Sequence, residues 1–411
     1  MTWANTWFTF NCGYEVNEQN QCESIAGAAS LGLEYLVADA GWYECAHPYW
    51  WDGVGSWVPR ADAFPNGFAP VAARGAQGGV GFGLWFEPER AALTSRLARQ
   101  HPEWMLGATR DHTAMAATVG VRHVSLLVDL GLREVQDWLI GLVDTYVAQG
   151  MRWFRHDFNL DPLDLWRAAD PPRRRGITEI RYIEGLYRIL DEIHRRHPGL
   201  YIEGCASGGR RIDLETISRN HGYWATDMMC GTPEPMQAHV WGFNHYLLAN
   251  WHNTVLQTPN APVADTPANR YAFFSFLGGA PCLAFDLRSP QLDTVLGRRW
   301  LELFRQIRHL FMGDFYPLTA CSLAPDRWLA SQFHRPDLDE GVVVAFRRPH
   351  SPDGHARFPL GGLRPEGRYR LLDCLGGGET AVAGRELAAG LSVGLPDRPA
   401  VAILRYTPVR G

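Results

Sequence analysis

The chain has 411 residues, of which 46% are hydrophobic, and its formal net charge is −5. This length allows one large domain with a smaller module, and the mildly acidic balance argues against nucleic acid or an anionic membrane as a partner. All 39 cationic side chains are arginines, which excludes chemistry that needs a lysine Schiff base.

Strands and amphipathic helices are expected to alternate from the start of the chain. Short apolar runs predict three strands at residues 7–10, 35–39 and 80–86, and three more at 152–157, 200–203 and 223–227. Two further strands are expected near 254–256 and 282–285. Polar residues gather at the carboxyl end of several of these runs.

Two segments between the predicted strands carry apolar residues at helical spacing. One runs from residue 135 to 147 and stops at Gly150, and the other runs from 180 to 193 and stops at Pro198 and Gly199. Strands separated by such helices pair in parallel, and repeated right-handed βαβ units of this number close most readily into a barrel. We therefore predict an α/β fold, a (β/α)8 barrel over residues 1–315.

From about residue 316 the pattern changes to short β-type runs, such as 341–346 and 401–406. Glycine-rich turns such as 375–378 separate them. This spacing predicts a small antiparallel β-sandwich over residues 316–411.

Two aspartates stand directly after predicted strands, Asp157 in the segment 155–159 and Asp227 in the segment 225–228. A parallel β/α barrel keeps its catalytic groups at that end of its strands. Since a pair of carboxyl groups is the minimal equipment for breaking a glycosidic bond, the two aspartates predict a glycoside hydrolase.

Short motifs along the chain resemble those of the α-galactosidase (melibiase) families, glycoside hydrolase families 27 and 36, and family 36 more closely. They occur in the family order at residues 5–7, 38–42, 55–57, 64–67, 84–89, 128–130, 155–159, 205–210 and 226–227. The resemblance implies a retaining, exo-acting hydrolase that releases terminal α-linked galactose. In that reading Asp157 is the nucleophile, and Asp227 is the acid that protonates the leaving oxygen and then the base that activates water.

The protonation states of the two aspartates can be predicted from their neighbours. Arg155 should lower the pKa of Asp157, whereas apolar surroundings made by Trp224, Met228 and Met229 should raise the pKa of Asp227.

The same resemblance supplies candidates for contact with the sugar. They are Trp7, Asp39, Trp85, Arg155, Asn159, Cys205, Ser207 and Gly208. Trp7 matches a tryptophan beside the galactose pocket, and Cys205 matches a cysteine that borders it. Gly208 lies in a glycine-rich loop that lets the backbone turn close to the sugar. Glu87, Glu89, Arg122, His123 and Asp129 are candidates for either pocket or purely structural roles.

Two positions depart from the family pattern. Arg155 stands where a lysine is usual, and a planar guanidinium is not equivalent to a compact ammonium. Asp39 matches the first of two aspartates that grip the 4- and 6-hydroxyls, but Ala40 replaces the second. The loss removes roughly 1.5–3 kcal/mol of hydrogen bonding to a substrate hydroxyl. The glycone therefore stays open among galactose, β-L-arabinopyranose, α-D-fucose and N-acetylgalactosamine.

Other readings remain open at this level. A catalytically silent sugar-binding barrel would also account for the missing acidic group, and a transglycosylase would use the same covalent intermediate. Family 36 enzymes usually place a long β-sandwich before the barrel, whereas the first strand is expected here within ten residues. The chain is then either a short natural form or one that has lost that domain, and a homo-oligomer stays open.

Eight cysteines without a Cys-x-x-Cys pair or a Cys/His cluster predict neither a zinc site nor a disulfide scaffold. No apolar run reaches the roughly 18 residues needed to cross a membrane, and the N-terminus lacks a secretory pattern. We therefore expect a cytoplasmic enzyme that uses no metal or other cofactor and that takes a carbohydrate substrate.

Overall fold

The structure is a computed structural model that describes residues 1–45, 50–110, 124–227, 231–249 and 251–409. None of the helices within these ranges is long and apolar enough to cross a membrane.

Eight parallel strands form a closed barrel, as the sequence predicted. Around the barrel they follow the order β1-β11-β10-β9-β8-β7-β3-β2. Their bounds are β1 (Trp3–Asn5), β2 (Tyr35–Ala38), β3 (Gly81–Phe86), β7 (Met151–His156), β8 (Tyr201–Gly204), β9 (Gly222–Trp224), β10 (His252–Leu256) and β11 (Ala280–Leu283).

The chain divides into two compact units. Residues 3–29 and 33–227 make one unit with strands β1 to β9, and residues 1–2, 30–32 and 228–411 make the other with strands β10 to β19. All of the candidate site residues belong to the unit with β1 to β9.

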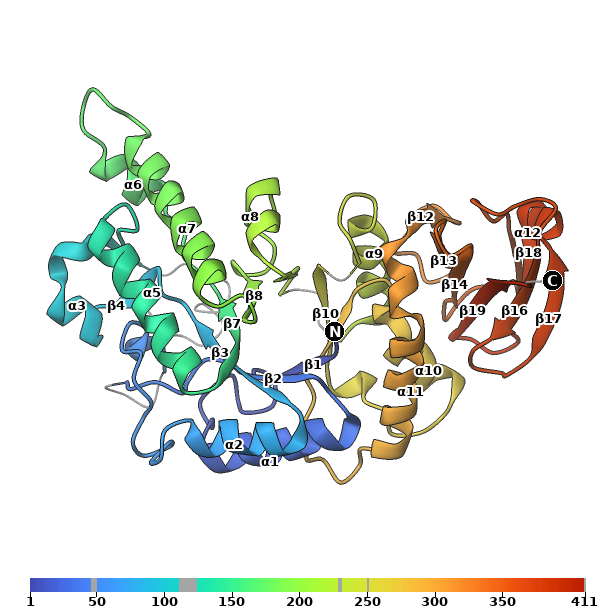
Figure 1. Ribbon diagram of the computed structural model, residues 1–411, viewed down its shortest axis with the longest axis horizontal. Helices are drawn as coiled ribbons and strands as arrows, with labels where there is room; N and C mark the ends of the chain where they lie inside the picture. The colour runs from blue at the N-terminus through green and yellow to red at the C-terminus, as the bar shows by residue number, and fades with distance from the viewer. Residues whose placement is uncertain (46–49, 111–123, 228–230, 250, 410–411) are drawn as a thin grey trace. The chain divides into compact units, whose positions relative to one another are not determined.

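Helices connect the strands of this unit (Figure 1). They are α1 (Glu18–Leu31), α2 (Ala69–Gly78), α3 (Arg96–Gln100), α5 (Arg133–Ala148), α6 (Leu163–Ala169), α7 (Ile177–Arg196) and α8 (Leu214–Arg219). The two helices predicted from apolar spacing are α5 and α7, which pack against each other. Each buries its apolar face: Leu139 and Val143 in α5 and Ile189 and Ile193 in α7 are completely buried.

The strand register brings three side chains near Asp157 into one row. Trp85 of β3 pairs with Arg155 of β7, and Arg155 pairs with Glu203 of β8. Residues directly opposite each other on neighbouring strands point to the same face of a sheet. The register therefore aligns these three side chains beneath Asp157, which follows the last residue of β7.

The predicted first strand at residues 7–10 is wrong. That segment forms turns, and the first strand is β1, which pairs in parallel with β2. The sixth strand also ends earlier than predicted, at Trp224, so Asp227 lies in the segment after β9 and not at its tip. Outside the barrel, β4 (Arg90–Ala92), β5 (Met105–Arg110) and β6 (Val124–Val128) form a small antiparallel sheet that the sequence did not predict.

The other unit contains helices α9 (Pro233–Phe243), α10 (Pro267–Phe273) and α11 (Thr294–Ile307), followed by antiparallel sheets. One sheet has six strands in the order β12-β13-β14-β19-β16-β17, and β15 pairs with β18. The bounds are β12 (Asp314–Pro317), β13 (Leu329–Arg335), β14 (Glu340–Arg347), β15 (His355–Phe358), β16 (Arg368–Asp373), β17 (Glu379–Ala383), α12 (Gly384–Gly390), β18 (Leu391–Gly394) and β19 (Ala400–Pro408).

The two antiparallel sheets share a core that includes Val343, Phe358, Tyr369 and Val393. This is the β-sandwich that the sequence predicted, and the glycine-rich turn at 375–378 joins β16 to β17. The boundary between residues 315 and 316 stays a prediction.

Candidate active site

Asp157 is held at the end of β7 by hydrogen bonds to both carboxylate oxygens. Its Oδ2 accepts from Trp85 Nε1 at 3.0 Å and from Asn159 Nδ2 at 2.9 Å. Its Oδ1 accepts from the backbone N–H of Phe158 at 2.8 Å. Donors on both oxygens favour the ionised form of the carboxyl group.

The pKa of Asp157 lies below its ordinary value. Burial by itself raises this pKa, because the residue is only 7% exposed. The positive charge of Arg155 and the hydrogen bonds from Asn159, Cys205 and Trp85 outweigh that effect. Asp157 is therefore a carboxylate at neutral pH, in the direction that the sequence predicted.

Arg155 is the central cation of the site. Its Nη1 donates to Glu203 Oε1 at 2.6 Å, and its guanidinium lies over the ring of Trp224, 4.1 Å from the ring centroid. Its Nε lies 3.1 Å from Asp39 Oδ2 as an ion pair, although the N–H is not aligned for a hydrogen bond. Since Trp153 Nε1 also donates to Glu203, at 2.9 Å, that carboxylate is itself fixed.

Asp39 follows β2 and is tied to the first strand. Asn5 Nδ2 donates to its Oδ2 at 2.6 Å, and the N–H of Ala40 donates to its Oδ1 at 2.9 Å. The hydroxyl of Thr6 accepts from the backbone N–H of Asp39. Burial, the first cause, raises the pKa of Asp39 above its ordinary value, and the charge of Arg155 works in the opposite direction.

Asp227 lies after β9 and is exposed when the whole residue is considered, although surrounding protein shields its carboxyl group from water. Its Oδ1 accepts from Trp224 Nε1 at 2.8 Å. Removal of water by the surrounding protein and the negative charge of Asp157 raise the pKa of Asp227 to about 6. The direction agrees with the prediction. The hydrogen bond from Trp224 acts in the opposite direction and lowers this pKa.

The loop after β8 carries three of the candidate residues. Cys205 is buried and its pKa is raised well above the usual value, first by burial and then by the charge of Asp157, so the thiol stays protonated. Ser207 Oγ donates to Asn159 Oδ1 at 2.7 Å, which orients the amide that holds Asp157. A Cβ on Gly208 would lie 2.9 Å from the Cα of Thr226 and 3.0 Å from the N of Asp227. This glycine thus allows the loop to contact the segment that carries Asp227.

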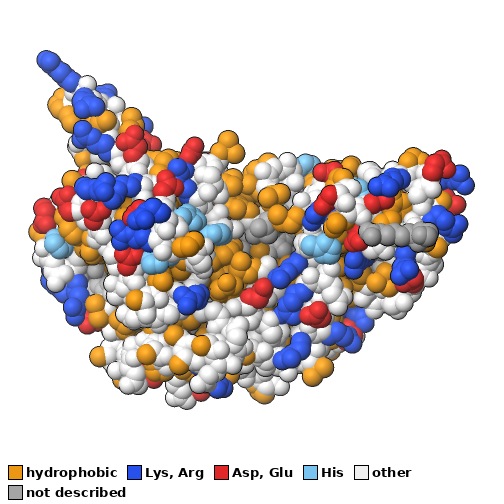
Figure 2. Space-filling view, viewed as in Figure 1, with side chains coloured by type: hydrophobic (Ala, Val, Ile, Leu, Met, Phe, Trp, Pro, Cys, Tyr) orange, Lys and Arg blue, Asp and Glu red, His pale blue; other side chains and the backbone are white. Residues whose placement is uncertain are grey.

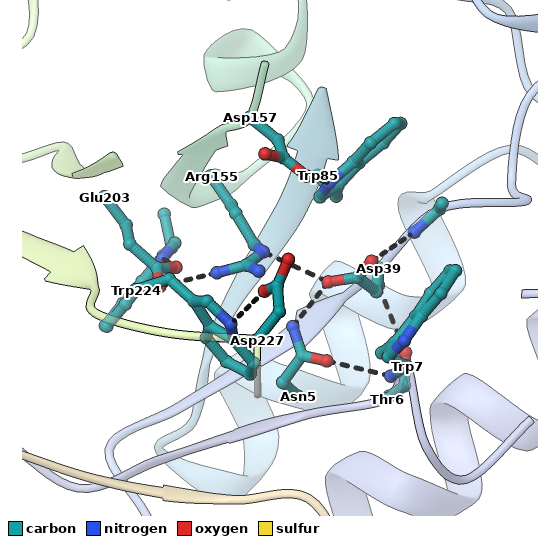
Figure 3. Close-up of polar contacts among 12 residues, drawn as sticks. Asn5, Thr6, Trp7, Asp39, Trp85, Arg155, Asp157, Glu203, Trp224 and Asp227 are labelled. Carbon is teal, nitrogen blue, oxygen red and sulfur yellow. Dashed lines mark hydrogen bonds and ion pairs between the residues drawn. The ribbon is translucent and has the colours of Figure 1, made fainter. Parts of the chain in front are cut away.

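Figure 3 shows the carboxylates of Asp39 and Asp227 facing the guanidinium of Arg155, with Asp157 and Trp85 nearby. Trp7 is partly exposed beside Asp39, and its backbone N–H donates to Asn5 Oδ1 at 2.8 Å. The structure therefore brings the predicted site residues into one cluster.

Two side chains that hold the candidate site residues were not assigned a role from the sequence. Glu203 binds Arg155 and Asn5 binds Asp39. A charged residue within the apolar run 200–203 was a signal that could have identified Glu203. The candidates Arg122 and His123, and the neighbours Met228 and Met229, lie outside the described residues.

The remaining acidic candidates have distinct partners. Glu87 pairs with Arg90 at 2.5 Å and accepts from the N–H of Asn159 at 2.6 Å. Asp129 accepts from the N–H of Gly131 in the turn before α5. Within the described ranges, no group of three or more His, Cys, Asp or Glu side chains is placed to hold a metal ion.

These observations define a class of protein, a β/α barrel with two inequivalent carboxyl groups in the segments that follow β7 and β9, the two strands on either side of β8. One carboxyl group is ionised and the other has a raised pKa, which is the division of labour that acid–base and nucleophilic work on a glycosidic bond requires.

The chain belongs to the melibiase family, whose model matches residues 2–233. Alpha-galactosidase AgaA of Geobacillus stearothermophilus is 31% identical over 394 residues, which cover 93% of this chain and 51% of that protein. Alpha-galactosidase C of Emericella nidulans is 28% identical and is covered to 48%. The chain therefore spans about half the length of the curated relatives that it matches.

Solved structures share the fold. The crystal structure of the family 36 enzyme AgaA from Geobacillus stearothermophilus has a TM-score of 0.84 at 23% identity, covering 99% of this chain and 55% of that chain. A structure of an AgaA variant in complex with raffinose has a TM-score of 0.83 at 22% identity, again covering 99% of this chain and 55% of that chain.

Proposed function

We propose that the protein is a retaining, exo-acting glycosidase that releases terminal α-linked galactose, with Asp157 as the nucleophile and Asp227 as the acid and base. The observation that carries this proposal is the opposite displacement of the two pKa values, downward for Asp157 and to about 6 for Asp227.

In the first step Asp157 attacks the anomeric carbon. A bond forms between a carboxylate oxygen and that carbon, while the bond from the carbon to the leaving oxygen breaks. Asp227 transfers its proton to the leaving oxygen and becomes a carboxylate. Because the attack comes from the opposite face, the sugar is held as a β-linked ester.

In the second step Asp227 acts as a base. It removes a proton from a water molecule, whose oxygen attacks the anomeric carbon and breaks the ester bond. Asp157 is released as a carboxylate and Asp227 is protonated again. Two inversions leave the product in the α configuration.

The proposed sugar contacts surround the two aspartates. Asp39 and Arg155 supply an acceptor and a donor for hydroxyl groups, and Trp7 and Trp85 supply aromatic walls. Asn159, Cys205, Ser207 and Gly208 lie around the nucleophile. Relatives that bind raffinose and stachyose make oligosaccharides with a terminal α-galactose the first substrates to test.

A galactose relative is the second candidate, and Ala40 is the observation that favours it. Asp39 already accepts hydrogen bonds from Asn5 and Ala40 N–H, and it is also paired with Arg155. Ala40 adds no side-chain acceptor beside Asp39, so this part of the pocket lacks one of the acceptors expected for galactose hydroxyls. A sugar that lacks the 6-hydroxyl, such as a β-L-arabinopyranoside or an α-D-fucoside, demands fewer of them.

The decisive experiment compares Asp157→Ala and Asp227→Ala on aryl α-galactosides with good and poor leaving groups. We expect Asp157→Ala to lose at least about 10⁴-fold in kcat on every substrate, in line with loss of a covalent nucleophile. Asp227→Ala should lose far more on poor leaving groups than on good ones, because only poor ones need a proton. Asp164→Asn on α6, an exposed control, should behave as the parent.

Parental turnover by either aspartate variant would contradict the assigned roles. Binding of galactose without turnover of any substrate would favour a silent sugar-binding barrel. Parallel assays of the galactoside, fucoside, arabinopyranoside and N-acetylgalactosaminide rank the glycones, and product analysis at high acceptor concentration separates hydrolysis from transglycosylation.

A further inference from the structure

Glu89, just beyond the end of β3, is the centre of a buried polar cluster that the proposed chemistry does not use. It is completely buried, and its two oxygens accept from Arg211 Nη1 at 2.6 Å and Nη2 at 2.9 Å. His156 Nε2 lies 2.9 Å from its Oε1, and the hydroxyl of Tyr182 donates to its Oε2 at 2.7 Å. The pairing of both oxygens offsets the cost of burying this carboxylate.

Arg211 is linked to both neighbours of Asp157, directly to Phe158 and through Glu89 to His156. Its guanidinium lies over the ring of Phe158, 4.1 Å from the ring centroid, and it holds His156 through the shared carboxylate of Glu89. The residues immediately before and after Asp157 are thus tied to one side chain.

The loop that carries Arg211 reaches the same strand end at a second point. Ser207 donates to Asn159, whose amide donates to Asp157 at 2.9 Å. The loop after β8 therefore holds the end of β7 in two ways. Arg211 fixes the residues next to Asp157, and Ser207 fixes the amide that binds the carboxylate of Asp157.

We propose that Arg211 is a positioning residue, which acts through Glu89, His156 and Phe158 to hold Asp157 in line with the anomeric carbon. The inference rests on the proposed role of Asp157 as nucleophile. Displacing a reacting group by about 1 Å costs on the order of 10²-fold in rate. A lysine cannot replace Arg211, because it lacks the planar fork that binds both oxygens of Glu89.

The test compares Arg211→Met and Arg211→Lys with a matched control, Arg219→Met. Arg219 also pairs with a carboxylate, Asp191, at 2.9 Å and also lies over an aromatic ring, that of Tyr187, at 4.3 Å. It takes no part in the cluster around Glu89. Thermal unfolding of each variant measures the stability that these similar contacts supply.

We expect both Arg211 variants to lose roughly 10- to 100-fold in kcat per folded molecule, with KM changed by less than about twofold. The loss should be the same for aryl α-galactosides with good and poor leaving groups, because the nucleophile and not the acid is displaced. Millimolar guanidinium should restore part of the activity of Arg211→Ala. The Arg219→Met control should keep the parental kcat.

Parental kcat in a folded Arg211→Met variant would overturn the proposal, as would a loss confined to poor leaving groups. Failure of all three Arg211 variants to fold would show a structural role only and would also overturn it. If Asp157→Ala keeps its activity, the proposed function fails instead. If Asp157→Ala is inactive and Arg211→Met is not impaired, only this inference fails.

Discussion

Arg155 shows how one cation can serve several carboxyl groups at once. It pairs with Glu203 and Asp39, lowers the pKa of Asp157 and also opposes the rise in the pKa of Asp227. Its planar guanidinium bridges Glu203 and Asp39 while it lies over Trp224, so an arginine suits this pocket. The departure from the family lysine is thus matched by partners that fit an arginine.

At the residue scale, Trp224→Phe tests the electrostatics of the acid. Activity should fall as pH rises through about 6, because Asp227 must be protonated for the first step. The indole N–H favours the ionised form of Asp227, so removing it should raise the pKa of Asp227. The basic limb of the pH profile, where activity falls, should then move to higher pH. A pH profile of kcat/KM on an aryl α-galactoside with a poor leaving group measures the shift.

The acidic limb of that profile provides the control. It reports protonation of Asp157, whose pKa is below its ordinary value and whose hydrogen bonds do not involve Trp224. It should stay in place. A basic limb that did not move, or that moved to lower pH, would contradict the account of Asp227.

The sequence could predict that both aspartates follow barrel strands, because an acidic residue after an apolar run is visible locally. The partner of Arg155 could not be predicted in this way. Glu203 is 48 residues away and meets Arg155 only through the register of β7 and β8. Trp224 was identified as a neighbour of Asp227, but its effect depends on where the indole N–H points. Only the folded geometry determines that direction.

At the element scale, the loop after β8 links the two aspartates. Ser207 contacts the β7 end through Asn159, and Gly208 lies against the backbone of Thr226 and Asp227. The loop adopts left-handed backbone at Ser207 (φ 47°) and Gly208 (φ 80°). Such a conformation lets a short segment turn sharply between two strand ends.

Replacing Gly208 by alanine should therefore damage activity as well as stability. The new Cβ would meet backbone atoms at 2.9 and 3.0 Å, so the segment with Asp227 has to move. We expect a loss of at least about tenfold in kcat on aryl α-galactosides, because a displaced acid protonates poorly.

Gly79→Ala is the matched control for this change. Gly79 caps α2 with a φ of 69°, and a Cβ there meets nothing within 4 Å. Alanine at this position should lower the free energy of unfolding by about 1–2 kcal/mol, the cost of left-handed backbone for a residue with a Cβ, and should leave kcat unchanged. Equal kcat values for the two variants would contradict the role given to the loop.

The first strand was the element that the sequence misplaced. Residues 7–10 are rich in the aromatic side chains that strands favour, yet they form turns that continue to left-handed backbone at Asn11 and Cys12. The preceding residues Trp3–Asn5 pair with β2 instead. Tertiary pairing overrides local β-propensity in such short segments.

At the scale of the whole molecule, charges of both signs are interspersed over the face in Figure 2, in keeping with the small net charge. The antiparallel sheets belong to the same compact unit as helices α9 and α10. Tyr271 of α10 packs on Phe346 of β14, with ring centroids 5.8 Å apart, and Gln237 of α9 accepts from Arg348 at 3.3 Å.

A chain shortened to residues 1–315 should consequently be less stable than the full chain. It loses Phe346 and the sheet behind it, and burial of one such side chain contributes about 1.5–3 kcal/mol. We expect the shortened chain to aggregate or to unfold at a lower temperature than the full chain, and calorimetry measures the unfolding temperature. A chain that ends at Pro408, which keeps β19, should unfold like the parent. Unchanged stability of residues 1–315 would instead support an independent barrel domain.

The sequence by itself determined the parallel barrel and the C-terminal sandwich, and it indicated two aspartates after the ends of barrel strands. Hydrophobic periodicity and polar residues at strand ends are local properties, which can be recognised from short stretches of sequence. Only the tertiary structure decided which side chains meet: Arg155 with Glu203, Asp39 with Asn5, and Arg211 with Glu89. These pairs join residues from 34 to 122 positions apart, and strand register and barrel closure, not local pattern, bring them together.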